Sequence, residues 1–473
     1  MVNGQQPMVN GQSDSIRVTL LTCSPGPEVY ELYGHTAIRV QTPSTGRTPG
    51  EESFPLEEGE VWRGSDIVFN YGVFDMSKPY FAWHFVLGET DYMVQPIPWK
   101  YFVREYEERG SSITEQELNL TSWEAQRLTG RLIENCLPEN REYRYNFLYK
   151  NCTTMVRDMV EDAINGRIQY PDTLPHQTYR EILHRYTADH PWAQEGNDLL
   201  LGADVDTVLS ERAAMFVPDN LMQAFDGAFI CTPRGDMRPL VRSKAVLIAK
   251  SEELRVKNES NHLDGSDDGN SDSSLFTLHS SLKFTPLSAM LAFGILCIII
   301  MLLEVWAKRI FWLWDVLLLL LQGAAGTLLT FMFFFSGHPA VDSNWQIWLL
   351  NPIAFVGIPL VIISAIKHKP TRWYAFQFAV LALFLLFSPW IPQVFAKITV
   401  PLALCLLTRP ISYYLVRGKE HGARSKKPEL RGKGHGARSK RPELRGKEHG
   451  ARSKGQGARG KEQEIRSKRK AKN

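Results

Sequence analysis

Cysteine is scarce in this chain, with six residues among 473. The six are Cys23, Cys136, Cys152, Cys231, Cys297 and Cys405. No close pair of cysteine and histidine residues has the spacing of a zinc site, which argues against a metal centre. Disulfides among Cys23, Cys136 and Cys231 are chemically allowed in an oxidising compartment, but the spacing does not indicate any.

An apolar signal segment is also missing from the first residues. Residues 1–14 are polar and are predicted to form a disordered N-terminus. A translocated domain needs a signal sequence, so the polar start suggests a trimmed sequence or a misplaced start codon. Leu20–Cys23 faintly resembles a lipoprotein cleavage site. It lacks a small residue before the cysteine and a preceding apolar run, which favours Cys23 as a core residue.

Long hydrophobic runs are absent before Leu287 and frequent after it. Five candidate spans follow: Leu287–Trp306, Ile310–Phe335, Trp345–Ile366, Trp373–Phe387 and Ile391–Leu407. About 20 apolar residues cross the hydrocarbon core, and the first three runs meet that length. The last two are short, which leaves a tight or re-entrant hairpin open. A buried soluble core is the alternative, but such cores are rarely apolar on every helix face. Residues 287–410 are therefore predicted to form a transmembrane bundle of about five helices.

The charge of the chain is very uneven. Residues 417–473 hold 21 Lys or Arg and 6 Glu, while the whole chain has a net charge of +3. Gly418–Arg431 and Gly432–Arg445 repeat with a period of 14. Such a polar repeat cannot offset the entropy of ordering, so residues 411–473 are predicted to be a disordered basic tail. A solvated tail near anionic inner-leaflet lipids is a simpler interpretation than a nucleic-acid contact.

Basic residues in the short loops predict the orientation. The first loop contains Lys308 and Arg309, the third contains Lys367, Lys369 and Arg372, and the second contains neither Lys nor Arg. Positively charged loops stay in the cytoplasm. Residues 15–250 are therefore predicted to be an extracytoplasmic domain, 251–286 a flexible linker and the tail cytoplasmic.

The outer domain reads as a mixture of α and β structure. Alternating apolar residues predict strands over Ser15–Thr22, Thr36–Gln41 and Asp66–Tyr71. A capping motif at Thr121 predicts a helix over Ser122–Cys136. Helical spacing of apolar residues predicts another over Thr153–Ile164.

One cysteine and one histidine in this domain have the positions of a catalytic pair. Cys152 starts the second helix, where free N–H groups and the helix dipole stabilise a thiolate nucleophile. His35, at the mouth of a strand, would accept the thiol proton, and Asn70 or alternatively Tyr71 would orient it. A cysteine at a helix start is more often inert. The further histidines that remain candidates are His84, His176, His184 and His190.

Several motifs together resemble the Lnb N-terminal periplasmic domain family, lipoprotein N-acyltransferases of the Bacteroidetes type. The motifs are Leu20–Gly26, Gly34–Val40, Asp66–Asp75, Asp91–Met93 and Asn151–Thr154. The order of histidine and cysteine is also similar to circularly permuted papain-like folds, such as NlpC/P60 relatives and the lecithin:retinol acyltransferase group. The fold expected is thus an α+β permuted papain-like domain followed by an all-α transmembrane bundle. Met155 departs from the basic residue expected there, which puts an anionic contact at this position in doubt.

The resemblance implies a membrane-bound acyltransferase in the cell inner membrane, with its catalytic domain in the periplasm. Cys152 would take an acyl chain from a phospholipid with His35 as base, and the amine of a diacylated lipoprotein would then accept that chain. Backbone N–H groups at Cys152 and Thr153 would stabilise the oxyanion, with Asn151 in support. No cofactor is expected.

Three other functions stay open at this point. They are an NlpC/P60-type cell-wall cysteine peptidase, a phospholipase that hydrolyses the thioester, and a non-enzymatic membrane-anchored module. Five spans favour lipid substrates, because a single anchor would suffice for a peptidase.

Overall fold

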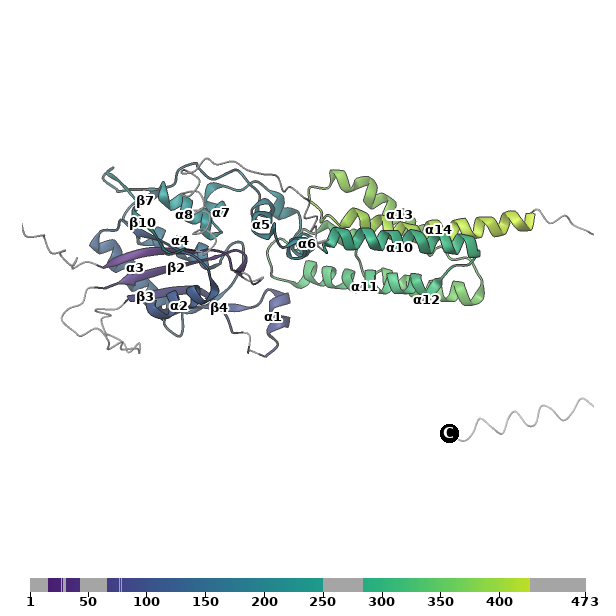
Figure 1. Ribbon diagram of the computed structural model, residues 1–473, viewed down its shortest axis with the longest axis horizontal. Coiled ribbons are helices and arrows are strands. Elements are labelled where there is room, and N and C mark those ends of the chain that lie inside the picture. The colour runs from purple at the N-terminus through teal and green to yellow at the C-terminus, as the bar shows by residue number, and fades with distance from the viewer. Residues whose placement is uncertain are drawn as a thin grey trace, which may run out of the picture. The chain divides into compact units, whose positions relative to one another are not determined.

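The computed structural model describes residues 16–26, 28, 31–42, 66–75, 77, 79–249 and 284–425 (Figure 1). The predicted disordered N-terminus 1–14 lies outside the described residues. So do nearly all of the predicted linker and the tail beyond residue 425.

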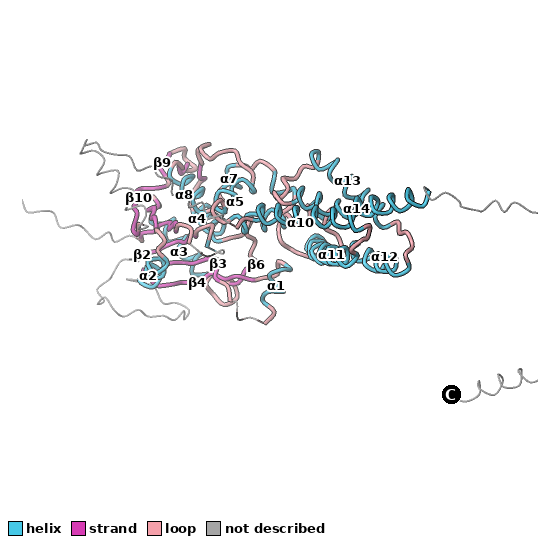
Figure 2. Tube along the Cα trace, turned by 45° about the vertical axis from the view of Figure 1, so that its right-hand side comes forward, coloured by secondary structure: helices cyan, strands magenta, loops and turns pink. Residues whose placement is uncertain are grey.

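The centre of the outer domain is a seven-stranded sheet, whose strands are magenta in Figure 2. Every neighbouring pair of these strands is antiparallel. Its spatial order is β10-β5-β1-β2-β3-β4-β6. The strands are β1 (Arg17–Cys23), β2 (His35–Gln41), β3 (Asp66–Val73), β4 (Asp91–Pro98), β5 (Ile113–Leu118), β6 (Glu142–Arg144) and β10 (Val241–Ile248). The three strands predicted from the sequence are β1, β2 and β3, and their observed ends lie within two residues of the predicted ones.

Helices cover both faces of this sheet, because alternate residues of β1 and β2 are apolar on each side. Leu21 and Ala37 pack on one face against Phe102 of α2 (Trp99–Arg109). Leu20 and Ile38 pack on the other face, in the core that includes α3, α4 and α8. The strands are therefore buried on both sides and hold the residues at their ends in fixed positions.

The two predicted helices are present with their caps. α3 (Ser122–Asn135) begins at a capping box formed by Thr121 and Glu124, and α4 (Cys152–Ala163) begins at one formed by Asn151 and Thr154. The other outer helices are α1 (Phe81–Leu87), α5 (Tyr179–Thr187), α6 (Pro191–Leu200), α7 (Glu211–Ala214), α8 (Pro218–Asp226) and the 3-10 helix η2 (Ala203–Asp206). A small antiparallel sheet contains β7 (Arg167–Gln169), β8 (Phe229–Cys231) and β9 (Met237–Pro239).

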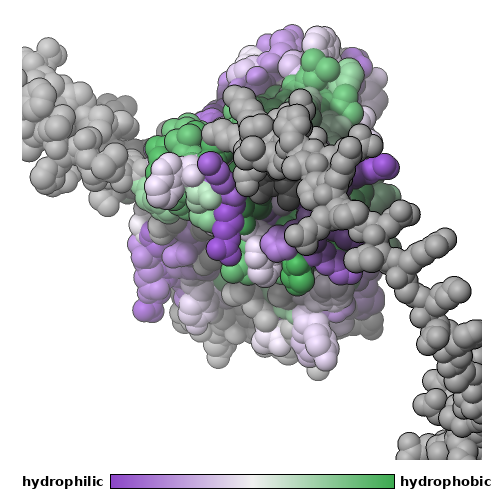
Figure 3. Space-filling model, turned by 90° about the vertical axis from the view of Figure 1, so that its right-hand side faces the viewer, coloured by the Kyte–Doolittle hydropathy of each residue, from purple (hydrophilic) through white to green (hydrophobic). Residues whose placement is uncertain are grey.

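The region after residue 284 is all-helical. Its elements are α10 (Pro286–Ala307), α11 (Trp312–Phe335), η3 (Trp345–Trp348), α12 (Ala354–Lys367), α13 (Trp373–Phe387), η4 (Ser388–Trp390) and α14 (Thr399–Ser425). Among the described residues, four helical segments are long and apolar enough to cross a membrane. Only 11% of the most apolar stretch of α10 is buried by the protein, so its surface suits contact with lipid. Figure 3, a view along this region, shows hydrophobic and hydrophilic side chains next to one another.

Two of the predicted spans have different bounds in the structure. The third was expected from Trp345, but its helix starts only at Ala354, after η3 and a turn at Pro352 and Ile353. The fifth was expected from Ile391, but α14 starts at Thr399 and continues past the predicted end at Leu407. Residues 391–398 between η4 and α14 are not helical, so the last two segments do not form the tight hairpin that the sequence left open.

A cluster of buried charged residues joins these helices. Arg409 of α14 donates to both carboxylate oxygens of Glu304 on α10, each at 2.8 Å, and to Asp315 on α11 at 2.5 Å. Tyr374 on α13 also donates to Asp315, and Ser412 donates to Glu304. All five side chains are buried. Charges in an apolar environment are stable only when paired, so this cluster fixes four helices against one another.

Candidate active site

The start of α4 is organised by the side chain of Asn151. Its Oδ1 accepts hydrogen bonds from the backbone N–H groups of Thr153 and Thr154, both at 2.9 Å. Its Nδ2 donates to the backbone oxygens of Phe147 and Phe216. Asparagine is a favoured N-cap, and this buried one also ties the helix start to two neighbouring segments. Cys152 is thus the first residue of a helix whose position is well fixed.

His35 and Asn70 lie on adjacent strands and contact one another. Nε2 of His35 is 2.5 Å from Oδ1 of Asn70. An amide oxygen only accepts hydrogen bonds, so Nε2 carries a proton and Nδ1 is left as the acceptor. Gly34, directly before His35, has φ +71°, and a Cβ there would lie 2.7 Å from the oxygen of Cys23. The glycine in Gly34-His35 is therefore required for the turn that positions the imidazole.

The electrostatics of Cys152 and His35 are coupled. Burial raises the pKa of the Cys152 thiol, but the charge and hydrogen bond of His35, with a hydrogen bond from the Thr36 N–H, lower the pKa overall to about 7. Burial alone would lower the pKa of His35. The charge and hydrogen bond of Cys152 have the larger, opposite effect, so the pKa of His35 is raised overall. The two groups stabilise a thiolate beside an imidazolium, which is the reactive form of a cysteine nucleophile.

Tyr71 and Thr153 are placed differently from the sequence interpretation. The hydroxyl of Tyr71 accepts a hydrogen bond from Asn135, so Asn70 and not Tyr71 contacts the histidine. The N–H of Thr153 is bonded to the cap and is not free for an oxyanion. Its hydroxyl lies 3.1 Å from that of Thr36, which joins α4 to β2. The N–H of Cys152 has no acceptor within the part of the chain that the structure describes, so it is the remaining backbone candidate for the oxyanion.

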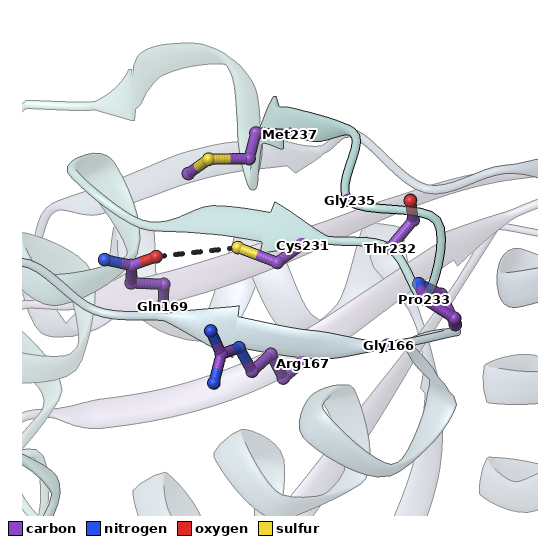
Figure 4. Close-up of a pocket in the computed structure, with 8 residues that line it drawn as sticks. All are labelled: Gly166, Arg167, Gln169, Cys231, Thr232, Pro233, Gly235 and Met237. Carbon is purple, nitrogen blue, oxygen red and sulfur yellow. Dashed lines mark hydrogen bonds between the residues drawn. The ribbon is translucent and has the colours of Figure 1, made fainter.

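The other outer cysteines lack these features. Cys23 is 1% exposed, and burial raises its pKa, in agreement with its interpretation as a core residue. Burial also raises the pKa of Cys136, to about 12. Cys231 lies at a surface hollow on the small sheet, next to Gln169 (Figure 4). These cysteines are all free thiols, so no disulfide joins them.

Among the described residues, none of the other candidate histidines forms a hydrogen bond or an ion pair with Cys152 or His35. His84 lies beside Glu89 at the surface, and His184 hydrogen-bonds Asp198. Among the described residues, no group of three His, Cys, Asp or Glu side chains could hold a metal ion.

Aromatic residues near Cys152 were not predicted as part of the site. Tyr145 stacks on Tyr92 with ring centroids 4.0 Å apart, and Tyr92 contacts Phe74 at 4.9 Å. Phe74 and Tyr92 belong to the motif segments, and Tyr145 precedes Asn151 by six residues. Aromatic residues at such positions are usually core residues. Only the fold brings β3, β4 and the segment before α4 together.

Comparison with protein families gives two matches. The model of the Lnb N-terminal periplasmic domain matches residues 8–185, and the model of the Lnb transmembrane domain matches residues 278–421. No curated protein and no solved structure matches the chain. The first match contains Cys152, His35 and Asn70. The second contains α10, α11, α12 and α13 and all of α14 but its last four described residues.

Proposed function

Because the chain belongs to the Lnb family, and is a membrane protein with a periplasmic domain before an all-helical membrane domain, we propose that it is a cysteine-dependent lipoprotein N-acyltransferase. The donor is a phospholipid, and the acceptor is the N-terminal amine of a diacylglyceryl-cysteine lipoprotein. The observation that supports this most directly is the contact of Cys152, His35 and Asn70 at a capped helix start.

In the first step the Cys152 thiolate attacks the carbonyl carbon of an acyl ester. A C–S bond forms, and the N–H of Cys152 donates to the oxyanion. The ester C–O bond then breaks, and the leaving alkoxide takes the proton from His35. A lysophospholipid departs and the acyl chain remains on Cys152 as a thioester.

In the second step the lipoprotein amine attacks the thioester. His35 accepts the amine proton, the C–S bond breaks and the thiolate is regenerated as the amide forms. Asn70 keeps the imidazole in one orientation through both steps, as expected of a group that holds the base. Both substrates reside in the membrane, in agreement with a catalytic domain attached to a transmembrane bundle.

The test is to trap the acyl-enzyme. The purified full-length chain is incubated with phospholipid in the absence of an amine, and intact-mass and peptide analysis locate the adduct. A fatty acyl group on Cys152 that hydroxylamine removes is expected, because hydroxylamine cleaves thioesters. Cys152→Ala should give no adduct, and Cys136→Ala, which changes a buried cysteine on α3's C-terminal cap, is the matched control.

Adding a synthetic diacylated lipopeptide, and muropeptides in a parallel reaction, distinguishes a transferase from a phospholipase and from a peptidase. A gain of one acyl group by the peptide supports a transferase, and release of free fatty acid alone supports a phospholipase. Cleavage of muropeptides without any acyl adduct supports a peptidase. An adduct on another residue, or N-acylation by the Cys152→Ala variant, contradicts the proposal.

A further inference from the structure

Helix α1 of the outer domain is bound to the end of a membrane helix. The three residues that directly follow α11 donate to the three last carbonyl groups of α1. Ser336 Oγ donates to Val86 at 2.8 Å, the Gly337 N–H donates to Leu87 at 2.7 Å, and His338 Nε2 donates to Phe85 at 2.5 Å. A Cβ on Gly88 would lie 2.6 Å from the N of His338, so the two segments are in close backbone contact.

This contact places α1 at the level where α11 leaves the bilayer. α11 is a span of 24 residues that ends at Phe335, one residue before the first of these donors. The loop after it lacks Lys and Arg, which predicts the outer side of the membrane. α1 therefore lies at the outer membrane surface.

The side chains of α1 suit this position. Trp83 is 54% exposed and Phe85 is 48% exposed, and Trp83 lies 5.3 Å from the ring of Phe331 on α11. Adjacent exposed aromatic residues on a soluble surface are unusual, whereas at the bilayer interface indole and phenyl rings are favoured. The exposed face of α1 continues the lipid-facing surface of α11.

A row of aromatic rings connects this face with the nucleophile. Phe85 contacts Phe81 at 6.2 Å, Phe81 contacts Phe74 at 5.9 Å, and Phe74 contacts Tyr92, which stacks on Tyr145. Phe74 follows Gly72 by two residues, and a Cβ on Gly72 would lie 3.6 Å from the Cβ of Cys152. Burial and then the nearby Cys152 thiolate raise the pKa of Tyr145. The row contains no charged side chain.

We propose that α1 and this aromatic row form the access route along which one acyl chain of an outer-leaflet phospholipid reaches Cys152. The proposal rests on the proposed function and adds the side from which the donor comes. A hydrocarbon chain matches a row of uncharged rings that starts at the membrane surface, whereas a phosphate head group would need basic or hydrogen-bonding partners along it. The head group would stay at the interface while the ester carbonyl reaches the thiolate.

The experiment compares two donors with four forms of the full-length protein. The donors are phosphatidylethanolamine in vesicles and a water-soluble butyryl thioester, and the forms are wild type, Trp83→Ala, Trp83→Phe and Trp123→Ala. Trp123 on α3 is also 54% exposed, but its ring contacts Arg127 on the same helix and, within the described part of the chain, no residue of the bundle. It is therefore a control for the loss of an exposed indole.

Trp83→Ala should acylate Cys152 from vesicles roughly tenfold more slowly than wild type, with the soluble donor used at an unchanged rate. Trp83→Phe should recover most of the loss, because a phenyl ring keeps the apolar contact. Trp123→Ala should match wild type with both donors. The unchanged rate with the soluble donor also shows that the variant is folded.

The outcomes separate this inference from the proposed function. If wild type forms no adduct on Cys152 from either donor, the proposed function fails. If wild type is active and Trp83→Ala retains the full rate from vesicles, the access route is wrong and the function stands. Equal loss with both donors also contradicts the route, because it would mean damage to the catalytic pair.

Discussion

At the scale of single residues, the reactivity of Cys152 depends on the charge of His35. The His35 charge and hydrogen bond bring the thiol pKa down to about 7 against the effect of burial. An isolated cysteine has a pKa of about 8.5. A thiol becomes more reactive as pH rises through its pKa, so Cys152 should reach full reactivity at a lower pH than an ordinary cysteine.

His35→Ala is therefore expected to move the reactivity of Cys152 to higher pH. Without the imidazolium, burial acts alone and the thiol pKa rises, so alkylation by iodoacetamide at pH 7 should slow by roughly tenfold or more. The protein is alkylated at pH values between about 5 and 10. The rate is measured from the modification of the peptide that contains Cys152. Asn70→Ala should give a smaller shift, because Asn70 acts through the imidazole. An identical pH profile in wild type and His35→Ala would show that the two groups are not coupled.

At the scale of helices and strands, local sequence patterns predict elements whose cause is local. The caps at Asn151 and Thr121 are each built within four residues. The sequence predicts the cap at Thr121 and a helix that starts at Cys152. The contact of His35 with Asn70 needs only the pairing of two neighbouring strands. The hydrogen bond from the Thr153 N–H to the Asn151 side chain is also local. It depends on the rotamer of Asn151, which the sequence pattern does not predict.

Elements held by distant partners were missed. β5 contains Glu115, which is buried although a charged residue argues against a core strand. Its carboxylate is paired with Arg39 at 3.0 Å and Arg17 at 3.1 Å, from strands more than 70 residues earlier in the chain. β10 at the sheet edge alternates weakly because its side chains are mostly exposed. The aromatic row near Cys152 depends on long-range packing in the same way.

The buried charges of the bundle give a prediction at this scale. Arg409→Leu should destabilise the bundle by about 3–5 kcal/mol, because it leaves the carboxylates of Glu304 and Asp315 buried without their cation. Thermal unfolding of the full-length protein in detergent should show a clearly lower midpoint. The variant that combines Arg409→Leu with Glu304→Gln and Asp315→Asn should recover much of the loss, because no unpaired charge remains. A single variant as stable as wild type would mean that the cluster is not paired as described.

At the scale of the whole molecule, the number of crossings decides on which side the basic tail lies. α12 has 14 residues, which at 1.5 Å per residue cover about 21 Å of a hydrocarbon core about 30 Å thick. Length alone therefore leaves open whether α12 crosses. Hydrogen bonds between the outer domain and the segments on either side of the α12–α13 pair indicate that α12 crosses. The segment before it donates to the outer domain through Asn344 and Gln346, and the segment after α13 does so through Val394 and Ile398.

These contacts put residues 336–348 and 391–398 on the side of the outer domain, so α12 and α13 must cross inward and return. The opposite loops carry Lys308, Arg309, Lys367, Lys369 and Arg372, as expected for cytoplasmic loops. Five crossings predict that the tail lies in the cytoplasm, on the opposite side of the membrane from Cys152. A fluorescent reporter that folds only in the cytoplasm should be active when fused after Asn473, and a phosphatase that folds only in the periplasm should be inactive there. Insertion of the two reporters after His368 should give the same pattern, and insertion after Ser343 the reverse. Phosphatase activity after both Asn473 and Ser343 would mean an even number of crossings, with α12 lying within the membrane without reaching its inner face.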